Sequence, residues 1–261
     1  MLERYKNSYL CYFLMYNFYY LSWAIFSALI SIYLLDKGFK ASEVSLVVST
    51  SFLTSMIFQP VIGMFSDRYD VKKVNFVLFT LAGIGGLAFM FASSLITITI
   101  GYSFVLTLIN GTNPVMEKIA SSSPYQYGKI RIWGTIGYAT GSWLAGMIYQ
   151  LISPSAIFIC FIITMILCII GLLGTQTPSE LGQNNEEKTK TSTLFHNYKY
   201  LYYLIIAAIF QGITNMANTY IPAMFQNDGL KVSLVSTILS FAVLCEAPLV
   251  LFSHKFMDKL T

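Results

Sequence analysis

Charged residues are scarce in this sequence. Asp, Glu, Lys and Arg together make up 11% of the 261 residues, whereas 56% of the residues are hydrophobic. A soluble domain carries about 25% charged residues, so a large water-soluble domain is excluded. The sequence also lacks the two-residue alternation of apolar and polar positions that a membrane β-barrel would show. Only helices remain as a way to satisfy the backbone inside a membrane.

Motifs for enzymatic and nucleotide chemistry are missing as well. The four cysteines have no metal-ligand spacing and the two histidines are isolated, so no metal site is predicted. No G-x-x-x-x-G-K-[ST] motif occurs, which argues against an ATP-driven pump. No nucleophile and base can be brought together from the sequence. We therefore predict that the protein is not an enzyme and needs no cofactor.

Long apolar runs take the place of the missing charge. A bilayer core about 30 Å thick requires about 20 mostly apolar residues in a helix. Runs of about this length occur at residues 8–34, 43–66, 74–92, 96–118, 129–151, 154–174, 199–225 and 232–253. The predicted fold is an all-α, polytopic membrane helix bundle with about eight transmembrane helices.

The basic residues indicate how the chain lies in the membrane. In this topology, thirteen of the sixteen Lys and Arg residues fall on one side, and only Lys37, Lys40 and Lys231 fall on the other. The positive-inside rule then places both termini in the cytoplasm. We expect the protein to lie in the plasma membrane. This distribution explains the net charge of +4, so we expect lipid and not nucleic acid as the surrounding partner.

Two short matches on one register predict an internal repeat. Residues 38–42 read GFKAS and residues 229–233 read GLKVS, a shift of 191 residues. The same shift places Asp67-Arg68 on Asp258-Lys259 without a gap. Because 191 residues cover six predicted spans, an even number, the two copies have the same orientation. Parallel repeats of this kind are typical of a transporter architecture with two six-helix halves.

The repeat divides the chain into three parts. Residues 1–175 are predicted to form an N-terminal six-helix bundle, and residues 199–261 the first two helices of a second bundle. Residues 176–198, rich in Gln, Asn, Thr, Ser and charge, are predicted to form a cytoplasmic linker. Against a twelve-helix, two-half fold, four spans are absent. The chain is therefore expected to be a fragment, a decayed gene product, or one part of an assembly with a complementary chain.

The loop after the second predicted span carries a family motif. Residues 63–73 read GMFSDRYDVKK and resemble the G-x-x-x-D-[RK]-x-G-[RK]-[RK] signature of the major facilitator superfamily. The resemblance implies a cytoplasmic conformational latch. Its residues would be Gly63, Asp67, Arg68, Lys72 and Lys73. Gly63 is expected to let two helices approach closely, and Asp67 to cap a neighbouring helix or to pair with an Arg.

Asp70 departs from this signature, which usually has Gly at that position. Asp tolerates left-handed backbone geometry better than most residues, so a tight turn is still expected there. The alternative interpretation is a basic loop that serves membrane topology alone.

A narrower resemblance covers the region between the fourth and fifth predicted spans. Residues 113–117 read NPVME and residues 127–138 read YGKIRIWGTIGY, which resemble lactose permease and its relatives. Phe58-Gln59-Pro60 and Cys245-Glu246-Ala247-Pro248 also fit this group of oligosaccharide–proton symporters and their nucleoside and phenylpropionate cousins. The resemblance implies proton-coupled uptake of a sugar, nucleoside or similar small polar solute by alternating access.

Arg131 is the first candidate for solute binding. With Thr135, Tyr138 and Ser142 it forms one polar helix face, and its planar guanidinium suits bidentate bonds to hydroxyl pairs. The resemblance implies that Arg131 binds the sugar and that Tyr138, which replaces a Trp of the group, stacks on its ring. The alternative is that Arg131 anchors the cytoplasmic end of its span.

Glu117 shares a helix face with Asn110 and Asn113, and we expect it to pair with Arg131 across the short loop. Two alignments with the group stay open. In one, Glu117 matches the sugar-binding acid of the family; in the other, Asn113 takes that position. Asn can still accept and donate hydrogen bonds to hydroxyls, but it cannot carry a proton.

Glu246 and Glu117 are the candidate proton carriers. Glu246 is predicted to lie well inside the eighth span beside Pro248, and a low dielectric favours the neutral form of a carboxyl group. The alternative for Glu246 is a structural carboxylate whose hydrogen bonds are satisfied.

Two neutral polar faces complete the candidate solute site. One lies on the first span and contains Asn17, Tyr20, Ala24 and Ser27; the other lies on the seventh and contains Gln211, Thr214, Asn215, Asn218 and Pro222. By symmetry these spans would face each other across a central cavity, with Asn17, Tyr20, Asn215 and Asn218 as solute ligands. The alternative is hydrogen bonding between helices.

Glycines in two spans are predicted to serve close helix packing. They are Gly83, Gly85 and Gly86 in the third span and Gly134, Gly137 and Gly141 in the fifth. Two rival functions also stay open: drug–proton efflux on the same fold, and a membrane subunit that transports nothing.

Overall fold

A computed structural model describes residues 6–176 and 197–248 of the chain, and these residues are helical apart from short connections. The helices are α2 (Tyr9–Ser27), α3 (Ile30–Asp36), α4 (Ala41–Arg68), α5 (Val71–Met90), α6 (Leu95–Ser121), α7 (Tyr127–Leu151), α8 (Ala156–Gly174), α10 (Tyr198–Asn227) and α11 (Val232–Leu244). The predicted all-α fold is confirmed. The predicted linker lies almost wholly outside the described residues.

Six helical segments of the described part are long and apolar enough to cross a membrane. They are Tyr9–Asp36, which comprises α2 and α3, and the helices α4, α5, α6, α8 and α10. Helix α7 has the length, with 25 residues, but glycine, hydroxyl groups and two cations make it less apolar. Helix α11 is described over 13 residues only. The spans at 129–151 and 232–253 therefore stay predictions.

The first span is not the continuous helix that the sequence predicts over residues 8–34. Helix α2 ends at Ser27 and α3 begins at Ile30, and Leu29 between them has φ −112° and ψ 15°. Neither glycine nor proline lies at the break, so the local sequence does not predict it. Helical hydrogen bonding resumes directly after the break, where the Tyr33 N–H donates to the Leu29 carbonyl.

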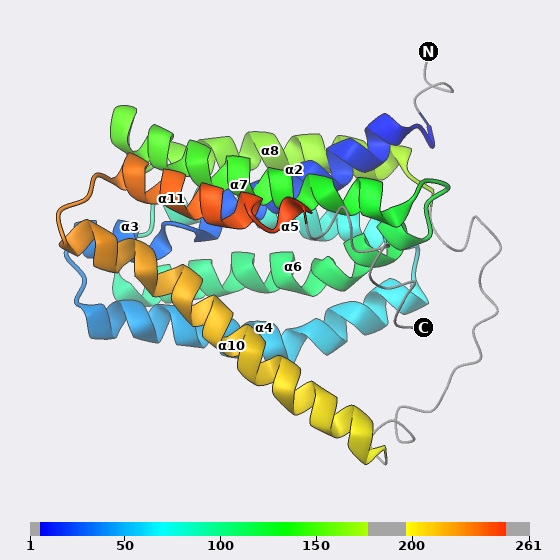
Figure 1. Cartoon of the computed structure of the whole chain (residues 1–261), viewed down its shortest axis with the longest axis horizontal. Helices are drawn as coiled ribbons and strands as arrows, with labels where there is room; N and C mark the ends of the chain where they lie inside the picture. Colours follow the sequence, from blue (N-terminus) through cyan, green and yellow to red (C-terminus); the bar gives the residue numbers. More distant parts are fainter. Residues whose placement is uncertain (1–5, 177–196, 249–261) are drawn as a thin grey trace.

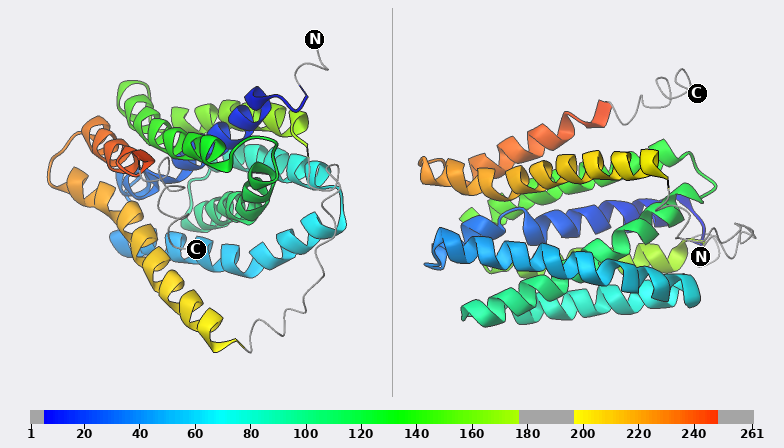
Figure 2. Two further views of the ribbon diagram at one scale, coloured as in Figure 1. Left: turned by 45° about the vertical axis from the view of Figure 1, so that its right-hand side comes forward. Right: turned by 90° about the horizontal axis from the view of Figure 1, so that it is seen from below.

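Helix α2 is the centre of the bundle (Figure 1). It packs between α7 and α8, while α5 packs on α6 and α8, and α4 packs on α6. Helix α11 lies along α7. The second half of α10 contacts α3, whereas its first half diverges from the other helices (Figure 2). The largest fully buried side chains include Tyr12, Tyr16, Tyr19, Phe26 and Tyr33 of α2 and α3.

Glycines of α7 allow it to lie directly against α2. A Cβ atom at Gly134 would come within 2.6 Å of the Tyr16 ring, and one at Gly137 would collide with the backbone oxygen of Asn17. At Gly141 a Cβ atom would lie 2.6 Å from the Leu21 carbonyl oxygen. The predicted role of these glycines is confirmed.

The predictions for the other glycines divide. A Cβ atom at Gly85 would crowd Phe104, and one at Gly86 would crowd Phe161, which confirms both. The predictions for Gly83 and Gly63 are wrong, because a Cβ atom at either position would meet nothing within 4 Å. Gly63 of the latch motif therefore holds no close helix contact in this conformation.

The loops that suggested an internal repeat have the same backbone. Gly38 and Gly229 both adopt a left-handed φ, 90° and 89°, directly after a helix. In each loop the next residue donates a hydrogen bond five residues back, from Phe39 to Leu34 and from Leu230 to Phe225. A lysine at the following position is then the N-cap residue of the next helix. The second sequence match, at residues 258–259, lies outside the described residues.

We expect Gly137→Ala to destabilise the fold, because the new methyl group would force α7 away from the Asn17 backbone. Overpacking of this kind costs about 1–3 kcal/mol. Gly63→Ala is the matched control, and it should preserve or raise stability by about 0.5–1 kcal/mol because its site is open. Thermal unfolding in detergent micelles measures both; equal melting temperatures for the two variants would contradict the packing described here.

Candidate functional site

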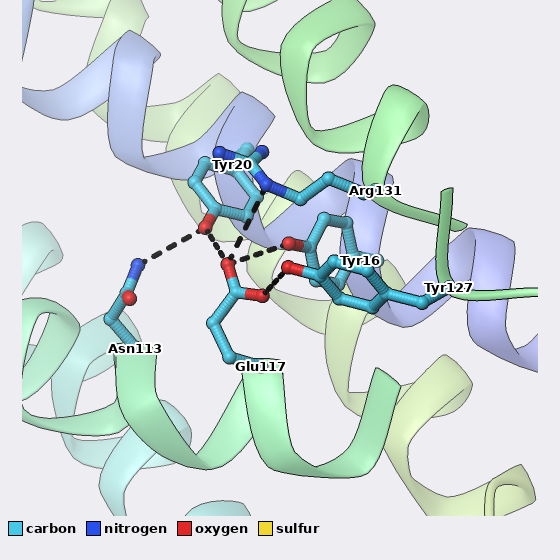
Figure 3. A network of polar contacts seen from close by, with 6 residues as sticks. All are labelled: Tyr16, Tyr20, Asn113, Glu117, Tyr127 and Arg131. Atoms are coloured by element: carbon cyan, nitrogen blue, oxygen red, sulfur yellow. Dashed lines mark hydrogen bonds and ion pairs between the residues drawn. The ribbon is translucent and has the colours of Figure 1, made fainter. Parts of the chain in front are cut away.

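The carboxylate of Glu117 is the centre of a polar network between α2, α6 and α7 (Figure 3). The hydroxyl groups of Tyr16 and Tyr20 donate to its Oε1 atom at 2.7 and 2.8 Å. The hydroxyl of Tyr127 donates to Oε2 at 2.5 Å. Three phenols from two helices therefore converge on one acid, which is the arrangement that a partly buried negative charge requires.

Arg131 approaches the same carboxylate oxygen that accepts from Tyr16 and Tyr20 (Figure 3). Its Nε atom is 4.0 Å from Oε1 of Glu117, and its guanidinium carbon lies 5.6 Å from the centre of the Tyr20 ring. The predicted pairing of Glu117 with Arg131 is thus present as a wide ion pair with a cation–π contact beside it. Asn113 extends the network, because its Nδ2 atom donates to the Tyr20 hydroxyl at 3.3 Å.

Helix geometry explains why these residues meet. Glu117 lies near the end of α6 and Arg131 near the beginning of α7, and the short connection at residues 122–126 returns the chain beside itself. Tyr16 and Tyr20 are four residues apart on one face of α2. The close α2–α7 contact at Gly134 then holds both rings against the acid. The side chains of Glu117 and Arg131 stay 30% and 34% exposed.

A cavity of about 470 Å³ adjoins this network. Its walls come from α2, α4, α6 and α7 on one side and from α10 and the end of α11 on the other. The polar lining residues are Tyr20, Ser27, Asn110, Arg131, Thr135, Tyr138, Gln211, Thr214, Asn215, Asn218, Thr219 and Glu246. The faces predicted on the first, fifth and seventh spans therefore meet at one cavity, which has the size and the mixed lining of a small-molecule site.

The structure does not bring every predicted residue to the cavity wall. Asn17 is 7% exposed, its backbone oxygen packs against Gly137, and it does not line the cavity. The prediction for Asn17 as a solute ligand is therefore wrong in this conformation. Asn113 and Glu117 are also not among the lining residues, and they reach the cavity through Tyr20.

Glu246 lies near the end of the described residues. Helix α11 ends at Leu244, and Glu246 lies exposed in the turn that follows, where it lines the cavity. Because the residues after 248 lie outside the described part, the position of Glu246 inside the eighth span stays a prediction. Of the two candidate proton carriers, Glu117 is the more enclosed.

Sequence reasoning missed three aromatic residues of the site. Tyr16 and Tyr127 donate to Glu117, and Trp23 lines the cavity. The Trp23 ring stacks on Tyr20 with centroids 5.8 Å apart, and it meets Tyr138 edge-on at 6.4 Å. The four-residue spacing of Tyr16 and Tyr20 was a usable signal, because it places both on one helix face.

The latch motif has a different geometry from the one expected. Asp67 pairs with Lys118 of α6 at 3.9 Å, with 75% and 56% of the two side chains exposed, and not with an Arg. Asp70 is not left-handed, since its φ is −58°. Its carboxylate instead caps α5 by accepting from the N–H groups of Lys72 and Lys73 at 2.9 and 3.1 Å. Arg68 ends α4 at the same loop.

Metal binding has no support in the part of the chain that the structure describes. Within residues 6–176 and 197–248, no group of three His, Cys, Asp or Glu side chains is placed to hold a metal ion.

Comparison with known proteins identifies the family. A membrane bundle with a central polar cavity between two groups of helices defines a transporter-like membrane protein. Residues 12–261 match the sequence profile of the Major Facilitator Superfamily. The chain belongs to this superfamily and is a multi-pass membrane protein.

Individual relatives are more distant. The chain is 27% identical over 255 residues to the uncharacterized transporter YwbF of Bacillus subtilis, covering 94% of this chain and 63% of the relative. It is 21% identical over 251 residues to a probable 3-phenylpropionic acid transporter of Escherichia coli, covering 92% and 65%. The sucrose permease of Escherichia coli is 26% identical over 164 residues, covering 58% and 39%.

A solved structure, that of the nucleoside transporter NupG, has the same fold. It superposes with a TM-score of 0.76 at 16% identity, covering 97% of this chain and 68% of that chain. The chain thus spans about two thirds of the length of the full-length relatives that it matches.

We expect Tyr16→Phe to destabilise the protein, because it removes a buried donor to the Glu117 carboxylate. Hydrogen bonds to charged groups contribute about 1.5–3 kcal/mol. Tyr198→Phe, at a side chain that is 75% exposed, is the matched control and should change nothing. Thermal unfolding in detergent measures both, and a Tyr16→Phe protein as stable as the control would show that the network is dispensable.

Proposed function

We propose that the protein acts as a secondary active transporter that takes up a sugar, nucleoside or similar small polar solute together with protons. The cavity supports this proposal most directly, because it combines Arg131 with four amide side chains and an aromatic cluster. Amides and hydroxyls can match a solute rich in hydroxyl groups, and the Tyr20–Trp23–Tyr138 cluster offers ring faces to a sugar or a base. Sucrose, raffinose and lactose permeases are among the relatives of the chain, which supports the same class of solute.

Glu117 is the acid that we assign to proton coupling. As a carboxylate it accepts from three phenols and faces Arg131. A proton on Glu117 would occupy one oxygen position and remove the negative charge. The oxygen that carries the proton would become a donor, so a phenol bonded to it would have to accept or turn away, and Arg131 would lose its counterion. Protonation would in this way change how Arg131 is presented to the cavity, which links proton binding to solute binding.

The membrane location follows from the same proposal. The chain would lie in the plasma membrane with both termini in the cytoplasm, as the distribution of Lys and Arg predicts. A complementary set of helices, on the same or another chain, would complete the wall on the open side of the cavity. Alternating access would then expose the cavity first to one side and then to the other.

The direct experiment is uptake of radiolabelled sucrose, lactose and a nucleoside by proteoliposomes that contain this chain, with and without an imposed pH gradient. Arg131→Lys should lower uptake on the order of tenfold or more, because it keeps the charge but loses the planar fork. Lys129→Arg, an exposed cation two residues away, is the matched control and should leave uptake unchanged.

Failure of uptake for every solute and in both directions would favour the non-transporting subunit. Export of an apolar cation in place of uptake would favour drug efflux. Equal uptake by the Arg131→Lys and Lys129→Arg proteins would remove Arg131 from the solute site.

Glu117→Gln should separate exchange from coupling. The amide oxygen can still accept hydrogen bonds from phenols, whereas the amide nitrogen only donates, and the amide cannot release a proton. We expect solute counterflow to persist within a few-fold, while uptake driven by the pH gradient falls to background. Glu246→Gln, at the exposed cavity rim, should retain driven uptake. The opposite pattern would assign coupling to Glu246.

A further inference from the structure

Two apolar hollows lie along α4, separate from the central cavity. One has a volume of about 340 Å³, and its walls come from Ile62 and Phe65 of α4 and from Lys73, Val74, Val77 and Leu78 of α5. The other has a volume of about 410 Å³ and lies between α4 and α6. Ile62 lines both hollows, and neither shares a lining residue with the central cavity. Together they form one groove, which we call the α4 groove.

The α4 groove faces the surroundings of the protein. Phe58, Phe65 and Val77 in its walls are each about half exposed. Helices α4, α5 and α6, which form the walls, are all long and apolar enough to cross a membrane. In a bilayer the groove is therefore in contact with lipid chains, and its apolar walls suit a hydrocarbon occupant.

The length of the groove fits an acyl chain. On α4 it extends from Thr50 to Phe65, which are 15 residues apart. A helix rises 1.5 Å per residue, so the groove is about 22 Å long. One leaflet of a hydrocarbon core about 30 Å thick measures about 15 Å. The groove can therefore hold a whole acyl chain.

A basic cluster lies at one end of the groove. Lys73 lines the groove there and is exposed, and Arg68 and Lys72 belong to the same connection between α4 and α5. Figure 1 shows this connection at the same end of the bundle as the connection between α6 and α7. Because helix ends meet the head-group region of a bilayer, the three cations are placed at the level of lipid phosphates.

The acids of this connection have other partners. Asp67 lies 3.9 Å from the Lys118 ammonium group of α6. Asp70 accepts from the backbone N–H groups of Lys72 and Lys73 and so caps α5. In the part of the chain that the structure describes, no carboxylate forms an ion pair with the Lys73 side chain. The Lys73 ammonium group is thus available to an anion beside the groove.

We propose that the α4 groove binds one anionic phospholipid of the surrounding membrane. One acyl chain lies along α4, and Lys73 holds the phosphate with the charges of Arg68 and Lys72 nearby. Basic residues beside clefts between membrane helices are a known way to recognise anionic head groups. This inference is independent of the transported solute. It gives the basic motif at residues 68–73 a ligand outside the protein.

The test counts bound lipids by native mass spectrometry of the purified chain in detergent. Phosphatidylglycerol and phosphatidylcholine with identical acyl chains are titrated separately. We expect phosphatidylglycerol to bind about tenfold more tightly, because its phosphate is not masked by a cationic group. Lys73→Gln should weaken phosphatidylglycerol binding about fivefold and leave phosphatidylcholine binding unchanged. Lys129→Gln is the matched control: it removes an exposed cation at the same end of the bundle and should have no effect.

A second pair of variants tests the groove itself. Val77→Trp places an indole in the groove and should weaken the binding of both lipids several-fold. Ile84→Trp makes the same kind of change on the same helix, at an exposed position that lines neither hollow, and should have no effect. Both positions are exposed, so the folds should be preserved, as gel filtration will show.

Three results would overturn the proposal. Equal affinity of the parent for the two lipids, or equal binding by the Lys73→Gln and Lys129→Gln proteins, would remove the head-group contact. Equal binding by the Val77→Trp and Ile84→Trp proteins would place the lipid elsewhere. Release of phosphatidylglycerol by an equal concentration of glycerol 3-phosphate would indicate a site for free phosphate compounds. None of these measurements depends on uptake, so a chain without transport can still confirm the lipid site.

Discussion

A carboxylate inside a membrane protein must be satisfied by donors, and Glu117 imposes this requirement on the rest of the structure. Three tyrosine hydroxyls and one guanidinium surround it. Its partners lie on α2 and α7, so the network can exist only where both helices are held against the end of α6. The burial of the Glu117 charge and the packing of the central helices therefore depend on each other.

Small residues make this close helix packing possible. Gly134, Gly137 and Gly141 remove side-chain volume along α7, which lets the aromatic face of α2 approach it. Without a hydrophobic driving force between helices in lipid, such close van der Waals contact is a principal source of association. The same device recurs at Gly146, where it brings α11 onto α7. Glycine placement thus shapes both the polar network and the contact between α7 and α11.

Much of the site could be predicted from helix periodicity. The 3.6-residue repeat places Arg131, Tyr138, Asn215 and Asn218 on polar faces, and the structure brings these faces to one cavity. The same periodicity misled for Asn17, because a polar helix face can turn toward a neighbouring helix as well as toward a cavity. Gly63 and Asp70 show a related limit. The motif did not reveal that Gly63 would face open space or that Asp70 would cap α5.

The amino-acid pattern alone established that the chain is an all-helical membrane protein, because scarce charge and runs of about 20 apolar residues leave no other way to satisfy the backbone in lipid. It also determined the pairing of Glu117 with Arg131, since a short connection joins their helices. The packed fold was needed to show that Tyr16 and Tyr127 complete the network and that Asp36 bonds α7 and α10. Those contacts join residues up to 190 positions apart, and their geometry depends on how helices pack, which no local pattern encodes.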